Sequence, residues 1–429
     1  MSIWAAVLTV SCLTFTGAAW ADWPQQDKLL ASDGFEYDRF GRAVSISGNY
    51  AIVGAWGDDD NGSESGSAYI FETDGMGWTQ KAKLTASDGD PCDYFGDCVS
   101  ISDGYAIIGA FAHDANGVGS GSAYIFYRHL KYIPPNFVWV WEEQSELTAS
   151  DAAVYDYFGY SVSISGDYAV VGAVGTDMKG DYSGSAYIFK RDGAIWSEQK
   201  KIYAFDAEPM EYFGHSVSIS GDYAIVGAYK DDDNGQHSGS AYVFRRSGTN
   251  WICEDKLLAS DGDPYDYFGC SVSISGDYAI VGAYKDDDNG EDSGSAYLFK
   301  RDGTVWTEVG KVLALYGRHD DWFGYSVSIN GDYAVVAAPE QDAAYVFNRY
   351  GSAWKQVFKL AASDGPGGLF GASISISEDS AIVGASGDND SGFWAGSAYV
   401  FKVCPPVDLN GDCAVDFADF AGFAQYWLQ

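Results

Sequence analysis

The sequence predicts an all-β protein, a seven-bladed β-propeller of four-stranded antiparallel blades. The first observation is that the dipeptide Phe-Gly recurs seven times in the 429 residues, most often 55 residues apart. The second is that each repeat holds runs in which apolar and small residues alternate, a period typical of strands. The third is that a Trp precedes each Phe-Gly by 16 or 17 residues. The seven dipeptides begin at Phe40, Phe95, Phe158, Phe213, Phe268, Phe323 and Phe370.

The fifth repeat shows the expected elements in order. Residues 271–275 alternate between Ser and a branched residue, and Gly276 then begins a tight turn. Further strands are expected at 278–283, at 295–299 and from Trp306 onward, which makes four strands per repeat. A sheet with two apolar faces is unstable alone, but a ring of such sheets buries every face and leaves only short edges. Seven repeats therefore predict seven blades.

The two chain ends are expected to close the ring together. The last repeat ends at 401–402 without a Trp strand, whereas the strand that begins at Trp23 has no preceding three strands. The N-terminal segment should therefore supply the outer strand of the last blade. The second repeat has eight extra residues and the sixth lacks seven, and both changes fall between expected strands, as expected for loops.

The strongly acidic composition limits the classes of molecule that the protein can bind. The chain has 25 Lys and Arg against 61 Asp and Glu, a formal charge of −36, which excludes nonspecific binding to nucleic acid and to anionic membranes. The expected ligand is an extracellular protein or a glycan. Residues 1–21 carry no charge and end in Ala-Trp-Ala, as expected for a secretory signal peptide, and no later apolar run is long enough to span a membrane. We therefore expect a secreted, extracellular or cell-surface protein with its first domain at 22–402.

Six cysteines follow the predicted signal peptide. An even number in an exported protein permits disulfides, although the sequence does not show their connectivity. The short separations favour a Cys92–Cys98 pair and a Cys404–Cys413 pair. Cys253 and Cys270 are expected to be buried free thiols.

The aligned repeats resemble the FG-GAP repeat, which is known from the integrin α-subunit head and from secreted bacterial proteins. Outside the sixth repeat, each Phe-Gly is followed by Gly-Ala and then by a Ser-Gly-x-Ala-Tyr run, in which the seventh repeat has Ala395 in place of Ser. The sixth repeat has Ala337-Ala338 in place of Gly-Ala and lacks the Ser-Gly. The resemblance implies a propeller that serves adhesion, binding or scaffolding. In calcium-binding members an Asp-rich loop joins the FG and GAP strands. That connection is a tight hairpin here, so the family's usual calcium site is not implied.

Acidic clusters occur at other positions. Three follow Gly-Ala, at 58–60, 231–233 and 286–288, and a second acidic set precedes each Phe-Gly, as at Asp261. Strand parity places both sets on one face of the propeller. Two interpretations remain open, because Asp, Asn and Gly suit exposed turns for backbone reasons and carboxylates on Gly-containing turns also suit calcium.

The C-terminal segment 403–429 predicts a separate calcium site. Oxygen-bearing side chains stand at positions 1, 3, 5, 9 and 12 of a twelve-residue loop that a helix-like run follows, which is the EF-hand spacing. This EF-hand-like loop-helix resembles one half of a type I dockerin, which implies a cohesin-like or surface-anchoring partner. The family has two such halves, and Cys413 replaces the turn-forming Gly. The expected ligands are Asp408, Asn410, Asp412, the Ala414 carbonyl, Asp416 and Asp419.

Catalytic patterns are scarce in this chain. The five histidines do not fall at equivalent repeat positions, and neither a phosphate-binding loop nor a nucleophile elbow is present. The leading prediction is a noncatalytic binding or adhesion propeller with an acidic loop face and a C-terminal attachment or sorting module. The alternatives are a carbohydrate-active enzyme, either a lyase or a glycosidase, and a structural surface or matrix component. A pair of carboxylates in the central channel would favour the enzyme.

Overall fold

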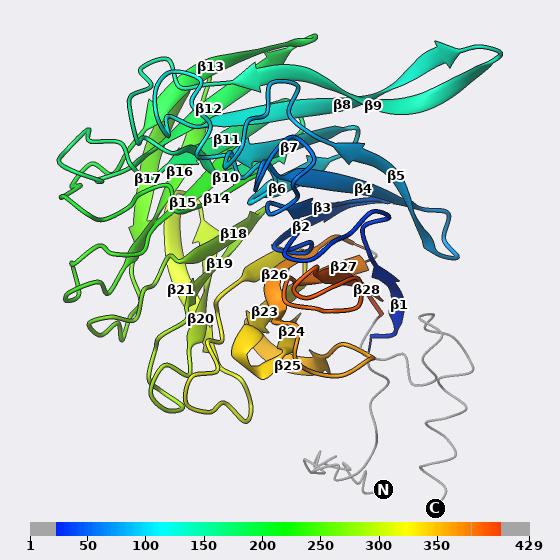
Figure 1. Cartoon of the computed structure of the whole chain (residues 1–429). Coiled ribbons are helices and arrows are strands. Elements are labelled where there is room, and N and C mark those ends of the chain that lie inside the picture. The colour runs from blue at the N-terminus through cyan, green and yellow to red at the C-terminus, as the bar shows by residue number, and fades with distance from the viewer. Residues whose placement is uncertain (1–22, 379, 405–429) are drawn as a thin grey trace, which may run out of the picture.

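The computed structural model describes residues 23–378 and 380–404, which form seven four-stranded antiparallel sheets arranged around a central axis (Figure 1). This confirms the predicted fold. Blade 1 contains β2 (Ala43–Ser47), β3 (Tyr50–Ala55), β4 (Ser67–Thr73) and β5 (Trp78–Leu84). Blade 2 contains β6 (Val99–Ser102), β7 (Tyr105–Ala110), β8 (Ser122–Ile133) and β9 (Asn136–Leu147). Blade 3 contains β10 (Phe158–Ser165), β11 (Tyr168–Ala173), β12 (Ser185–Asp192) and β13 (Ile195–Ile202).

The remaining blades repeat this order. Blade 4 contains β14 (Ser216–Ser220), β15 (Tyr223–Ala228), β16 (Ser240–Ser247) and β17 (Asn250–Leu257). Blade 5 contains β18 (Ser271–Ser275), β19 (Tyr278–Ala283), β20 (Ser295–Asp302) and β21 (Val305–Val312). Blade 6 contains β22 (Val327–Asn330), β23 (Tyr333–Ala338), the 3₁₀ turn η1 (Pro339–Gln341), β24 (Ala343–Tyr350) and β25 (Ala353–Leu360). Blade 7 contains β26 (Phe370–Ile376), β27 (Ser380–Ala385), β28 (Ser397–Lys402) and β1 (Gln25–Leu29).

The predicted ring closure is confirmed. Strand β1 pairs antiparallel with β28, so both ends of the described chain share blade 7. Trp23 is 2% exposed and packs edge-on against Tyr333 of blade 6, with ring centroids 5.4 Å apart. Trp306 of blade 5 packs against Tyr223 of blade 4 in the same way. The N-terminal Trp therefore fills the seventh position of a repeated contact between blades.

The Phe-Gly and Gly-Ala dipeptides contain glycine because a larger residue would not fit at these positions. Gly269 has a φ of +90°, and a Cβ at this position would lie 2.2 Å from the carbonyl oxygen of Ser240. A Cβ at Gly282 would lie 2.0 Å from the carbonyl oxygen of Gly324 in the next blade. Only glycine permits these close approaches. The repeated dipeptides thus mark the places where neighbouring backbones touch.

Serine hydroxyls connect the innermost strands. The N–H of Val272 donates to Ser216 Oγ of the preceding blade at 3.0 Å, and the N–H of Ile274 donates to Ser218 Oγ at 3.2 Å. The same hydrogen bond also joins the last blade to the first, because Ser373 Oγ of blade 7 accepts the N–H of Val44 in blade 1 at 3.2 Å. The alternating Ser residues of each repeat therefore face the neighbouring blade.

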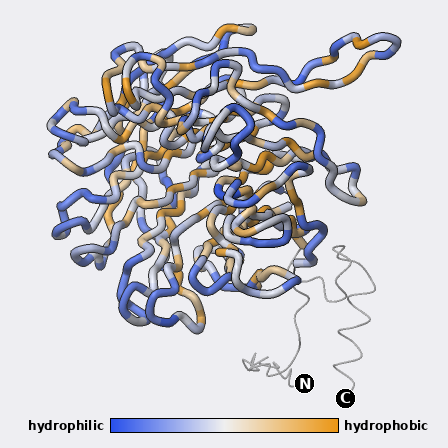
Figure 2. The backbone as a smooth tube through the Cα atoms, viewed as in Figure 1, coloured by the Kyte–Doolittle hydropathy of each residue, from blue (hydrophilic) through white to orange (hydrophobic). Residues whose placement is uncertain are grey.

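The β8–β9 hairpin extends well beyond the ring (Figure 1). This is where the second repeat has its extra residues, and Figure 2 shows apolar residues along the projecting part. Phe137 is 66% exposed and Trp139 is 58% exposed. In the described part of the chain no helix is long and apolar enough to cross a bilayer.

One predicted disulfide is wrong. Cys92 and Cys98 are free thiols. Cys92 lies on an exposed turn, whereas the intervening Phe95-Gly96 directs the chain inward and places Cys98 against the central channel. Cys253 and Cys270 are free as expected, the first partly buried and the second buried. Cys404 is disulfide-bonded, and its predicted partner, Cys413, lies outside the described residues.

Candidate functional site

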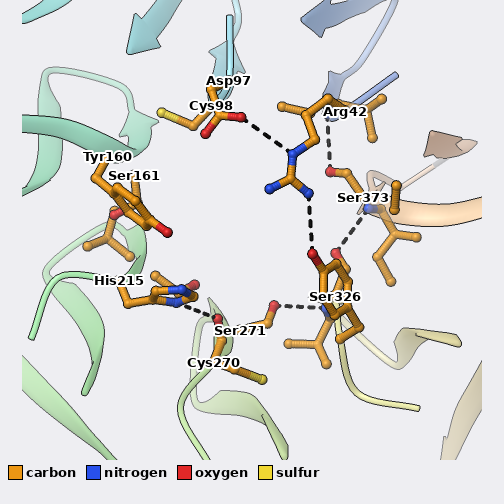
Figure 3. Close-up of a pocket in the computed structure, with 18 of the residues that line it drawn as sticks. Arg42, Asp97, Cys98, Tyr160, Ser161, His215, Cys270, Ser271, Ser326 and Ser373 are labelled. Carbon is orange, nitrogen blue, oxygen red and sulfur yellow. Dashed lines mark hydrogen bonds and ion pairs between the residues drawn. The ribbon is translucent and has the colours of Figure 1, made fainter. Parts of the chain in front are cut away.

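The residue that follows each Phe-Gly faces the central channel. This set, the channel ring, lines a cavity of about 430 Å³ at the end of the channel where the first strands begin (Figure 3). The seven repeats are nearly identical on either side of this position, yet here they carry six different residue types. The channel ring consists of Arg42, Asp97, Tyr160, His215, Cys270, Tyr325 and Ala372.

Arg42 and Asp97 form the charged part of the channel ring. The Nε of Arg42 lies 3.4 Å from Asp97 Oδ1, and its Nη1 donates to the Tyr325 hydroxyl at 3.3 Å. The nearby Asp97 carboxylate raises the pKa of Arg42 above its ordinary value. Figure 3 shows the guanidinium pointing into the channel from blade 1. A fixed cation, whose Nη2 makes no hydrogen bond to any described residue, therefore faces the cavity.

His215 supplies a neutral imidazole, whereas the Cys270 thiol lies against the carbonyl oxygens of Gly282 and Gly324. Burial lowers the pKa of His215 to about 4, so the imidazole is uncharged at neutral pH. Its Nδ1 lies 3.1 Å from the Cys270 carbonyl oxygen, and because a carbonyl can only accept, Nδ1 carries the proton. Burial also raises the pKa of the Cys270 thiol to about 12, which keeps it protonated and a poor nucleophile.

Aromatic side chains surround the same mouth. Successive rings lie 4.3–6.1 Å apart, from the Trp56–Tyr94 pair in blades 1 and 2 to the Trp322–Tyr325 pair in blade 6. His215 lies between Tyr160 and Tyr229 in this series. Part of the series encloses a second cavity of about 220 Å³. We call this set the aromatic shell: Trp56, Tyr94, Phe111, Tyr157, Tyr160, Tyr182, Tyr212, Tyr229, Tyr267, Tyr284, Trp322 and Tyr325.

Several shell residues have a strained backbone. Tyr157, Tyr212, Tyr267 and Trp322, each directly before a Phe-Gly, have φ between +54° and +56°. This left-handed conformation is unfavourable for bulky side chains and costs on the order of 1 kcal/mol each. The residues before the other three Phe-Gly dipeptides, Arg39, Tyr94 and Leu369, have the same conformation. The strain therefore belongs to the turn of the repeat, which also places the rings around the channel mouth.

The acidic loops do gather on this face, but in four blades they gather around a lysine. Lys256 Nζ lies 2.9, 2.8 and 2.7 Å from the carboxylates of Asp206, Asp231 and Asp233. Burial lowers the pKa of Lys256, the three carboxylates raise it, and the net result is a raised pKa. Equivalent lysine clusters are centred on Lys28, Lys83 and Lys311.

The lysine clusters favour the interpretation of the acidic loops of blades 1, 4, 5 and 7 as turns. In blades 1, 4, 5 and 7 an ammonium group already occupies the position between the carboxylates that a calcium ion would take. Sequence reasoning missed these lysines because they lie on the fourth strand, away from the acidic runs. A constant separation was the available signal: in blades 1, 4 and 5 the lysine follows the first buried Asp of its cluster by 25 residues.

Blade 2 differs from this pattern. It brings together Asp88, His113 and Glu146, whose potential ligand atoms all lie within 4.8 Å of one another. This is the one group of three or more metal-ligating side chains found in the described residues. The predicted calcium ligands Asp408, Asn410, Asp412, Ala414, Asp416 and Asp419 lie outside those residues.

Comparison with known proteins agrees with the repeat. A family model described as the FG-GAP repeat matches residues 23–71, 78–126, 141–189, 196–244, 251–299, 306–353 and 354–401. Hydrazine synthase from Kuenenia stuttgartiensis aligns with a TM-score of 0.53 at 9% identity, over 92% of this chain and 99% of that chain. A proposed 6-phosphogluconolactonase from Bacteroides fragilis aligns with a TM-score of 0.50 at 14% identity, over 75% and 84%. At such identities the likeness shows the fold alone. No curated protein matches.

Proposed function

Because the chain belongs to the FG-GAP repeat family, whose repeat makes up all seven blades, we propose that it is a noncatalytic binding protein of the cell exterior that holds its ligand at the mouth of the central channel. The channel ring is the observation that carries this proposal. Seven copies of one unit keep the same residues where packing requires them, yet differ where their side chains meet in the channel. A position with only a packing role in such a ring has no need of Arg, Asp, His and Tyr together.

The chemistry of the mouth fits a neutral oligosaccharide. The faces of aromatic rings are electron-rich and attract the weakly positive C–H groups of a sugar ring, and the aromatic shell offers many such faces. Arg42, Asp97 and neutral His215 offer hydrogen-bond donors and acceptors in the middle of them. Concave sites that combine apolar walls with a few placed polar groups are typical of small-ligand binding. The charge of −36 disfavours polyanionic glycans.

The chemistry of this mouth of the channel also supports binding in preference to glycoside hydrolysis. Hydrolysis of this kind generally uses two carboxyl groups on either side of the scissile bond. Asp97 is the one carboxylate among the described residues that line the 430 Å³ cavity, and it is paired with Arg42.

A screen of neutral oligosaccharides and extracellular proteins, followed by titration of the ligand it finds, tests the proposal. We expect Tyr284→Ala and Asp97→Asn each to weaken binding at least tenfold, because one removes a stacking face and the other a charged acceptor. Trp139→Ala is the control, since this exposed aromatic lies on the projecting hairpin. A ligand that responds to Trp139→Ala and not to the two channel variants would contradict the proposal.

We further propose that residues 403–429 form a calcium-binding attachment module beside the propeller. The contiguous EF-hand spacing from Asp408 to Asp419 supports this proposal, together with the disulfide at Cys404, where the segment leaves blade 7. A cohesin-like or surface partner remains the expected target of this module.

A further inference from the structure

Blade 2 has different residues at the positions that form the lysine clusters of the other blades. In blade 4, Lys256 on β17 lies opposite Tyr242 in the strand pairing, and in blade 2 the residue opposite the equivalent Tyr124 is Glu146 on β9. His113 stands where blade 4 has the buried Asp231, three residues after Ala of the Gly-Ala dipeptide. Blade 2 therefore lacks the lysine ammonium that neutralises the carboxylates of the other clusters, and it has an imidazole in place of one of those carboxylates.

The imidazole of His113 is buried and oriented. His113 is 7% exposed, and its Nδ1 lies 2.9 Å from Asp93 Oδ2. A carboxylate is an acceptor, so Nδ1 donates, and the lone pair of a neutral ring is then on Nε2. Nε2 lies 3.8 Å from Asp88 Oδ2 and 3.9 Å from Glu146 Oε1, and it makes no hydrogen bond to any described residue. Ligating histidines are commonly held in this way, by a carboxylate on the other ring nitrogen.

We propose that blade 2 binds one divalent transition-metal ion of the zinc type through His113 Nε2, Asp88 and Glu146. Bond lengths of about 2.0–2.2 Å in a tetrahedral site place neighbouring ligand atoms about 3.3–3.5 Å apart. The distances of 3.8 and 3.9 Å contract to this value with small side-chain rotations, and the Asp88 side chain is 49% exposed and able to move. Water completes the coordination, as the partial exposure of Asp88 and Glu146 permits.

The imidazole selects the class of metal. Calcium and magnesium prefer oxygen ligands, whereas one nitrogen with two carboxylates suits zinc and its first-row neighbours. The hydroxyl of Tyr124 donates to Asp88 at 2.9 Å, and that of Ser122 donates to Glu146 at 2.6 Å. These bonds hold both carboxylates toward the His113 ring. A metal ion would restore the positive charge that the lysine supplies in the other clusters.

A second explanation makes a different prediction. A protonated His113 would itself replace the lysine as the counter-ion of Asp88 and Glu146, and no metal would be needed. A zinc titration of the full-length chain distinguishes the metal site from the counter-ion role. The matched control is the double variant His113→Asp, Glu146→Lys, which rebuilds the residue pair that blades 1, 4, 5 and 7 already contain and is therefore expected to fold.

We expect the wild-type chain to bind one more zinc ion than the double variant, with at least tenfold higher affinity at that site. Zinc at 100 times the dissociation constant should raise the melting temperature of the wild type more than that of the variant. Cobalt(II) in place of zinc should give visible absorption bands in the wild type alone. Any zinc bound by other parts of the chain, including residues 403–429, is common to both proteins and cancels.

Two outcomes would overturn the inference. Equal zinc stoichiometry and affinity in the two proteins would show that the cluster does not bind metal. Wild-type protein without zinc-dependent stabilisation, together with a double variant of equal or higher melting temperature, would assign His113 to the counter-ion role. His113→Gln provides a second check, because it keeps the size of the side chain and removes the ligating nitrogen. Calcium at the same concentration should not distinguish any of these proteins.

Discussion

The indole Nε1–H of Trp23 donates to the carbonyl oxygen of Cys404 at 3.0 Å, a buried hydrogen bond between residues 381 apart in sequence. It lies beside the β1–β28 pairing and fixes the two ends of the described chain to each other. The Lys28 ammonium adds a second tie across the same junction, because it lies 3.0 Å from Asp388 of blade 7. Closure of the ring thus depends on a few contacts of the N-terminal strand.

Trp23→Ala should destabilise the propeller by about 3–5 kcal/mol, since it removes a fully buried aromatic side chain and its hydrogen bond. Denaturant unfolding followed by tryptophan fluorescence measures the change. Trp139→Ala, at an exposed position, is the control and should cost less than about 0.5 kcal/mol. Equal stabilities of the two variants would contradict the role given to Trp23.

Lys256→Ala should cost about 3 kcal/mol, because it leaves the buried Asp231 without its positive partner. Calcium should restore part of the lost stability, since the three carboxylates then surround a vacated cation position, and it should have no such effect on the wild-type cluster. Thermal melts with calcium and with chelator measure both effects. Lys190→Ala, at an exposed position of β12, is the control. If calcium stabilises Lys256→Ala and Lys190→Ala equally, the vacated cluster does not bind the ion.

Stability should rise as the pH falls from 8 to about 5.5. Burial raises the pKa of Asp266 and of Glu211 to about 7, and that of Asp38 to about 6. The folded chain therefore keeps protons that the unfolded chain loses between about pH 4 and 7, so stability is present at the acidic end of this window and is lost toward pH 7. We expect a melting temperature about 3 °C higher at pH 5.5 than at pH 8.

The control for the pH effect is Asp266→Asn. This variant keeps an acceptor for the Asp263 N–H but cannot titrate. It should show a smaller change in melting temperature across the same pH range. An unchanged slope would assign the effect to general charge repulsion in this acidic chain.

Gly269→Ala should be far more damaging than Gly276→Ala. Both residues have positive φ, +90° and +58°, but a Cβ at Gly276 meets nothing within 4 Å, whereas at Gly269 it meets the Ser240 carbonyl. Gly276→Ala should cost about 1 kcal/mol from backbone strain alone. We expect Gly269→Ala to lose at least twice as much stability in denaturant unfolding. Similar costs would show that the inter-blade backbone contact can relax.

The fold was predictable because the unit is repeated. The strand pattern found in residues 270–312 applied to every blade. The segment that begins at Trp23 has no partner strands in its own part of the sequence, and this predicted how the ring closes. The channel ring was not predicted, since recognising it requires knowing that the residue after Phe-Gly turns toward the axis. Its signal was present in the sequence as variation at one position of an otherwise regular repeat, from Arg42 to Ala372.

Short separation in the sequence led to a wrong disulfide prediction. Cys92 and Cys98 are six residues apart, but a left-handed turn at Gly96, with φ of +92°, separates an outer loop from the channel. Conversely, the lysine clusters join residues 23 to 50 positions apart in blade 4, for example Asp206 and Lys256. Pairing across a blade depends on strand register, which composition and local spacing do not reveal.

Sharing blade 7 between the two chain ends has a consequence during biosynthesis. Residues 25–29 emerge before every other strand of the ring, but their partner strand ends at Lys402, so at about 5–20 residues per second β1 waits roughly 20–75 s with an open edge. An unpaired strand is a template for aggregation, and charged or polar side chains are the usual protection. The β1 sequence is Gln-Gln-Asp-Lys-Leu, four polar residues and one apolar residue. The strand that closes the ring is thus suited to remain in solvent until β28 has been synthesised.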